Sequence, residues 1–259
     1  MYLTFKKFML GLISVFIFNI TAAQNAGKVI ETLNIKSNIL NRNVKYAIYL
    51  PSDYSTSERT YPVVYLLHGH TDDNTSWLQA GEINRYADKA IEEGTIPPMI
   101  IVMPDADSSF YINSYDGDEK YEDFFIKEFI PSIEKTYRIK NKKRFRGIAG
   151  LSMGGYGSLL YTIKYPELFA AAGCLSAAVF DDDSIVNMPE KSYQYIYGQL
   201  FGGNLKGKER LNKTWYSNSI LKLVEIKATA DLSKVRYWID CGDDDFLSRE
   251  EIVYYIWPL

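Results

Sequence analysis

The chain has 259 residues, of which 47% are hydrophobic and 24% are charged, so it can bury one large core and we expect a single domain. Its formal net charge of −3 argues against a nucleic-acid partner, because an acidic chain does not attract phosphates. Aromatic residues reach 15%, which suits a groove that stacks on sugars or aryl groups.

The N-terminus has the three parts of a secretory signal. Lys6 and Lys7 precede an apolar run from Phe8 to Ile20, and small residues follow up to Ala23. The run is shorter than the roughly 20 apolar residues that span a bilayer. We therefore predict a signal peptide over residues 1–23, export to the periplasm or the extracellular space, and a mature domain over 24–259 without a membrane span.

The first half of the domain reads as two pairs of strands. Val29 to Ile35 and Val44 to Leu50 alternate apolar and polar residues, which predicts an antiparallel hairpin. Pro62 to Leu67 and Pro98 to Met103 are continuous apolar runs, typical of strands that helices cover on both faces. Trp77 to Glu93, between them, has helical spacing.

Strands and helices continue to alternate in the second half. Tyr121 to Tyr137 predicts an amphipathic helix despite Pro131, and Gly154 to Tyr165 predicts a helix between strands Arg144 to Ala149 and Ala170 to Leu175. This alternation favours an α/β fold with a doubly wound, mostly parallel sheet.

The remaining residues predict a polar insertion and one more strand. Ala177 to Ser233 reads as short helices over the carboxyl edge of the sheet, with tyrosines in every second position from 193 to 197. Val235 to Cys241 returns to a strand, and Ser248 to Trp257 is helical. Cys174 and Cys241 fall in apolar runs, so we expect two buried, unbridged thiols.

The motif Gly150-Leu151-Ser152-Met153-Gly154, followed by Gly155, lies between a predicted strand and a predicted helix. A serine on so sharp a turn needs strained backbone angles, and glycines on either side let strand and helix approach closely. The helix that follows directs its N-terminal amides at an oxyanion formed during attack. We predict Ser152 as a nucleophile.

The segment His68-Gly69-His70 ends a neighbouring predicted strand. Its loop can offer a main-chain N–H to the oxyanion, which we assign to His70 as the partner of the Met153 amide. A metal site is not expected, because these are the only two histidines and no nearby cysteine completes a zinc set. We expect no cofactor.

Three adjacent aspartates, Asp243, Asp244 and Asp245, follow the strand that ends at Cys241. Carboxylates at the carboxyl end of a strand can reach the neighbourhood of the serine, and the order Ser then Asp fits this fold. Three neighbouring carboxylates are not all buried, so at least two belong to a solvated acidic turn.

Four segments together resemble the esterase family of the α/β-hydrolase fold that includes esterase D, feruloyl and acetylxylan esterases and related acyltransferases: His68 to His70, Tyr121 to Tyr137, Gly150 to Gly155 and Gly242 to Leu247. The resemblance covers most of residues 40–250. It implies hydrolysis of a small ester or an acylated carbohydrate through an acyl-serine. By motif position, Ser152 is similar to the nucleophile, Asp245 to the acid, and Met153 and His70 to the oxyanion amides.

The sequence departs from that pattern after Asp245. Such proteins are expected to continue through a helix and a strand to a histidine in a Gly-rich turn. Only 14 residues follow Asp245, none of them histidine, whereas such a crossover needs roughly 15 or more. We expect an incomplete C-terminus, an exposed edge at Val235 to Cys241 that lowers solubility, and impaired turnover, because the serine lacks its base.

Two alternatives stay open: a non-catalytic carbohydrate-binding protein that keeps the groove, and an acyltransferase of the same fold. His68 lies near enough to the serine strand to be considered as a substitute base, but a histidine there more often braces its loop. The sequence leaves the oligomeric state open.

Overall fold

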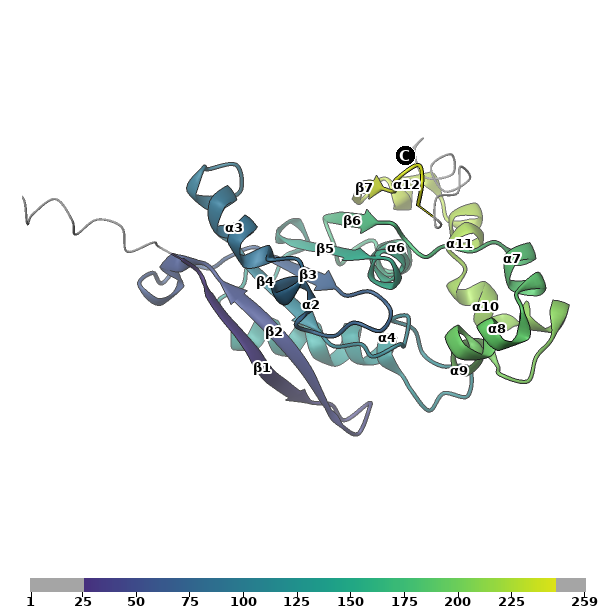
Figure 1. The fold of residues 1–259 in the computed structure, drawn as a ribbon. Coiled ribbons are helices and arrows are strands. Elements are labelled where there is room, and N and C mark those ends of the chain that lie inside the picture. Colours follow the sequence, from purple (N-terminus) through teal and green to yellow (C-terminus); the bar gives the residue numbers. More distant parts are fainter. Residues whose placement is uncertain (1–25, 246–259) are drawn as a thin grey trace, which may run out of the picture.

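The computed structural model describes residues 26–245. Figure 1 shows a central sheet between helices, with a group of short helices at one end. The predicted signal peptide and the predicted helix from Ser248 to Trp257 lie outside the described residues. Among the helices of residues 26–245, none has the length and apolar character needed to cross a membrane.

Seven strands of the described residues form one sheet in the order β1-β2-β4-β3-β5-β6-β7. Their bounds are β1 Lys28–Lys36, β2 Asn43–Leu50, β3 Val63–Leu67, β4 Ile100–Pro104, β5 Arg146–Leu151, β6 Ala171–Leu175 and β7 Arg236–Asp240. The pairs β1/β2 and β2/β4 are antiparallel and the other pairs are parallel. The predicted hairpin and the mostly parallel sheet are confirmed.

Side chains of the central strands alternate between two cores, which explains why β3 and β4 are apolar throughout. On one face, Tyr65 and Val102 belong to the larger core, which also takes in residues of the segment 121–139 and of α6 (Met153–Lys164). On the other face, Leu66 and Met103 pack with α2 (Ser76–Gln79) and α3 (Ile83–Glu92). Helices therefore lie on both sides of the sheet (Figure 1).

The predicted helix from Trp77 to Glu93 is wrong as a single element, because it breaks into α2 and α3. A Cβ at Gly81 would lie 2.8 Å from the Trp77 carbonyl oxygen, and Glu82 has a left-handed φ of 46°. The helical spacing continues across the break, but the chain turns sharply at these two residues.

The predicted helix from Tyr121 to Tyr137 forms as three consecutive helical segments: α4 (Tyr121–Phe124), a π-helical turn (Phe125–Phe129) and α5 (Ile130–Thr136). Pro131 lies in the first turn of α5, where its missing N–H costs no hydrogen bond of that helix. The wider π turn before it is how the helical segment accommodates the proline.

The polar insertion consists of short helices, as predicted: α7 Asp182–Asn187, α8 Glu190–Ile196, α9 Gly198–Phe201, α10 Lys213–Asn218, α11 Ile220–Ile226 and α12 Thr229–Leu232. Cys174 is buried in β6, but Cys241 lies just past β7 and is only half-buried, so the expectation of two buried thiols in strands is wrong for Cys241. Within residues 26–245, β7 forms an edge of the sheet and Trp238 on it is 71% exposed.

Candidate active site

Ser152 lies on a sharp turn between β5 and α6, with φ 55° and ψ −114°. Such angles cost a non-glycine residue about 1 to 3 kcal/mol and persist only where the surroundings hold them. The Ser152 amide donates to the Leu175 carbonyl at 2.9 Å, and its own carbonyl accepts from the Tyr156 amide at 2.9 Å and the Ala178 amide at 3.1 Å. The neighbouring strand and the following helix therefore hold the strained serine in place.

The glycines around Ser152 are fixed by close backbone contacts. A Cβ at Gly150 would lie 2.4 Å from the carbonyl carbon of Gly154, and a Cβ at Gly154 would lie 2.3 Å from the Leu67 oxygen. A Cβ at Gly155 would lie 2.8 Å from the Leu175 oxygen. The turn can therefore approach β3 and β6 only because these positions lack side chains.

The segment His68-Gly69-His70 lies next to the serine. β3 pairs with β5 so that Leu67 is opposite Gly150, and a Cβ at Gly69 would lie 3.8 Å from the Ser152 Cβ. The buried His68 ring is bonded through both nitrogens: Nε2 accepts from the Ala106 amide at 2.8 Å, and Nδ1 lies 2.8 Å from the Gly69 carbonyl oxygen. Because Nε2 accepts a hydrogen bond, the matching tautomer has its proton on Nδ1, which donates to the Gly69 carbonyl.

These bonds fix the peptide that carries the His70 amide. The Gly69 carbonyl accepts from the His68 ring and from the Asp72 amide at 3.2 Å. In a trans peptide the C=O and N–H point in opposite directions, so the His70 N–H points away from both donors. The predicted role of His70 as a main-chain donor, like that of Met153 at the first position of α6, stays a prediction.

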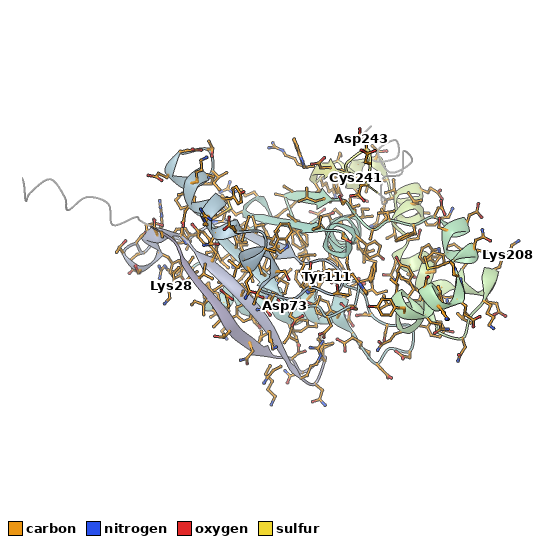
Figure 2. The ribbon with its side chains drawn as sticks, viewed as in Figure 1. Lys28, Asp73, Tyr111, Lys208, Cys241 and Asp243 are labelled. Carbon is orange, nitrogen blue, oxygen red and sulfur yellow. The ribbon has the colours of Figure 1, made fainter. Side chains whose placement is uncertain are left out.

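Tyr111 braces the same loop, and sequence reasoning missed it. Its hydroxyl donates to the His68 carbonyl at 2.9 Å, and its own carbonyl accepts from the Tyr161 hydroxyl at 2.6 Å. Tyr111 is fully buried in the interior (Figure 2), with a left-handed φ of 60°. No sequence pattern marks it, because the contact joins segments 43 residues apart.

The predicted acid lies two strands from the serine, at the same edge of the sheet. Leu175 pairs with Asp240, and beyond that pair Asp243 and Asp244 are exposed whereas Asp245 is half-buried. Figure 2 shows Cys241 and Asp243 beyond the end of β7. Partial burial raises the pKa of the Cys241 thiol, and the nearby charge of Asp245 raises it further. The role of Asp245 as the acid stays a prediction.

A small pocket lies near the serine turn. Its lining includes Phe110, Tyr156, Val179, Tyr197 and Trp215, so its walls are largely aromatic. Tyr156 is one of the residues whose amide bonds the Ser152 carbonyl, which places the pocket next to the turn. Among the described residues, His, Cys, Asp and Glu side chains form no group of three or more that could hold a metal ion.

A serine on a strained strand-to-helix turn, at the carboxyl edge of a mostly parallel sheet and beside an aromatic pocket, defines the α/β-hydrolase class. Residues 37–253 match the profile of the family described as "Putative esterase". The chain belongs to this esterase family, whose fold and relatives are those of carboxylesterase-type hydrolases.

Two relatives and one solved structure are similar to this chain. An endo-1,4-beta-xylanase/feruloyl esterase of Xylanibacter ruminicola is 34% identical over 72% of this chain, which spans 26% of that relative. An acetyl esterase of Caldicellulosiruptor saccharolyticus is 26% identical over 85% of this chain and 82% of the relative. A solved ferulic acid esterase is 32% identical, with a TM-score of 0.74, over 90% of this chain and 84% of its own.

Proposed function

We propose that the chain is a serine carboxylic-ester hydrolase that acts through an acyl-serine at Ser152 on acetyl or feruloyl-type esters of carbohydrates. The observation that carries the proposal is the strained Ser152 turn beside an aromatic pocket. The printed names of relatives, an acetyl esterase and a xylanase/feruloyl esterase, support this substrate class.

In the proposed reaction, the Ser152 hydroxyl oxygen attacks the ester carbonyl carbon while a base takes its proton. The negative oxygen of the tetrahedral intermediate accepts hydrogen bonds from the Met153 and His70 amides, the alcohol leaves with a proton, and water then hydrolyses the acyl-serine. Asp245 would orient the base, as the acid does in a Ser-His-Asp triad. The products are a carboxylic acid and the free alcohol.

We further propose that the 259-residue chain by itself turns over esters slowly, because neither of its two histidines is placed as the base. Both nitrogens of His68 are already bonded to main chain. The His70 ring packs against Phe110 and Tyr195. Loss of the triad histidine in a serine protease lowers turnover by about 10⁶, and about 10³ to 10⁴ over water survives.

Burst kinetics with an aryl acetate test this proposal. The purified chain should show no stoichiometric burst, and a burst equal to the enzyme concentration would contradict the slow turnover. Added imidazole supplies an external base, so it should raise the rate of the parent above that of Ser152→Ala. If imidazole accelerates both proteins equally, Ser152 is not the nucleophile and the proposed hydrolase mechanism fails.

A second candidate is a carbohydrate-binding protein without ester turnover, favoured by the engagement of both His68 nitrogens. Calorimetry with a xylo-oligosaccharide distinguishes it: binding without any Ser152-dependent hydrolysis, even with imidazole, would support this candidate.

We also propose that residues 24–259 form one esterase domain, exported after removal of residues 1–23. N-terminal sequencing of protein recovered from the periplasm or the culture medium tests this, with Gln24 as the expected first residue. Recovery with Met1 intact would contradict it.

A further inference from the structure

Three tyrosines of the insertion, Tyr193, Tyr195 and Tyr197, occupy opposite sides of α8 and its C-terminus. Residues four apart in a helix share a face, and accordingly Tyr193 and Tyr197 are both buried. Tyr195, two positions from each, points the other way and is 74% exposed. The alternating pattern therefore separates into two anchoring rings and one ring left in solvent.

The buried face holds α8 firmly. The Tyr193 hydroxyl donates to the Gly202 carbonyl at 3.3 Å, and the Arg210 guanidinium lies 3.9 Å from the centre of the Tyr193 ring. Arg210 is itself buried and donates to the Met188 carbonyl at 2.7 Å. Tyr195 is thus displayed from a helix whose opposite side is fixed by cation–π contact, hydrogen bonds and aromatic packing.

Tyr195 is nevertheless not isolated, because its ring contacts the ring of His70 in the loop after β3. The ring centres of Tyr195 and His70 are 6.0 Å apart, at 74°. On its other side His70 lies 5.8 Å from Phe110, and Phe110 lies 5.1 Å from Tyr197 in the pocket wall. A continuous row of rings therefore leads from solvent to the pocket beside Ser152.

The two ends of this row offer different surroundings. The pocket wall at the inner end is apolar and largely aromatic. The outer end presents one tyrosine face to water, with the hydroxyl and the neighbouring imidazole as polar groups. A pyranose has the matching character, since one face carries C–H groups and its rim carries hydroxyls.

We propose that Tyr195, with His70 beside it, is the specificity-determining surface for the alcohol side of the ester and stacks on the pyranose that carries the acyl group. The inference rests on the proposed esterase function and deepens it. The sugar lies at the outer end of the row of rings, where the rest of an oligosaccharide extends into solvent.

Calorimetric titration of the chain with an unesterified xylo-oligosaccharide tests the inference without any catalysis. Tyr195→Ala should weaken binding about three- to tenfold, the range that one aromatic contact corresponds to, and Tyr195→Phe should stay within about twofold of the parent. Tyr216→Ala is the matched control, because Tyr216 is an exposed tyrosine of α10 with no described contact to His70. It should bind as the parent does.

The inference is overturned if the parent does not bind the oligosaccharide at millimolar concentration, or if Tyr195→Ala binds like the parent. It is also overturned if Tyr195→Ala weakens the binding of a free hydroxycinnamate but not of the oligosaccharide, because the row of rings would then bind an aryl acid. Failure of the esterase function is a separate result: imidazole would not distinguish the parent from Ser152→Ala, while sugar binding still depended on Tyr195.

Discussion

Two glycines of β5, three residues apart, offer a matched test of how the serine turn is packed. Gly150→Ala would place a Cβ 2.4 Å from the carbonyl carbon and oxygen of Gly154, at the start of α6. Gly147→Ala adds the same methyl group to the same strand, but its nearest neighbour is the Val64 Cγ2 at 3.5 Å. Only the first substitution forces backbone atoms apart.

The expected magnitudes follow from those distances. Ordinary contact begins near 3.4 Å, so the Gly150 methyl group would be about 1 Å too close to main chain that cannot rotate away. Overpacking of this kind costs about 3 kcal/mol, at the upper end of its usual range. For a chain of this size that lowers the melting temperature by about 6 to 12 °C. Gly147→Ala should stay within about 0.5 kcal/mol of the parent.

Urea denaturation followed by circular dichroism measures both differences. The reasoning is refuted if Gly150→Ala is as stable as the parent, or if Gly147→Ala is destabilised equally. In the first case the turn is not close-packed, and in the second the strand itself does not tolerate alanine.

Three further predictions concern the loop after β3 and the ion pair of Arg146. Tyr111→Phe leaves the buried His68 carbonyl without its donor and should cost about 1 to 3 kcal/mol in urea denaturation, whereas equal stability would contradict the bracing role. Burial lowers the pKa of His70 below its usual 6.5, so the unfolded chain binds the proton more readily. The free energy of unfolding that this pKa difference contributes is present in full above pH 6.5 and is lost as the pH falls below it. The melting temperature should therefore fall less between pH 8 and pH 5 in His70→Gln than in the parent. Equal falls in the two proteins would refute the assignment. Arg146→Met removes the buried partner of the Glu134 carboxylate, whose side chain is 10% exposed, and should cost about 3 kcal/mol in urea denaturation. Glu134→Leu in the same chain should partly restore that loss.

Much of the fold could be predicted because its signals are local. Continuous apolar runs indicate central strands, and the strands at Val63–Leu67 and Ile100–Pro104 formed where those runs lie. The break at Gly81 was not predicted, since a helical spacing of apolar residues survives a turn of the backbone. The half-burial of Cys241 depends on where β7 ends, which is the least predictable property of a strand.

By itself, the sequence determined the position of the serine turn, because glycines flanking Ser152 act on the backbone within a few residues. Only the tertiary structure decided which groups surround it. His68 bonds the Ala106 amide across 38 residues, and Tyr195 meets His70 from an insertion more than 100 residues away. Such contacts depend on how the sheet and the insertion pack together, and no local pattern of residues records that packing.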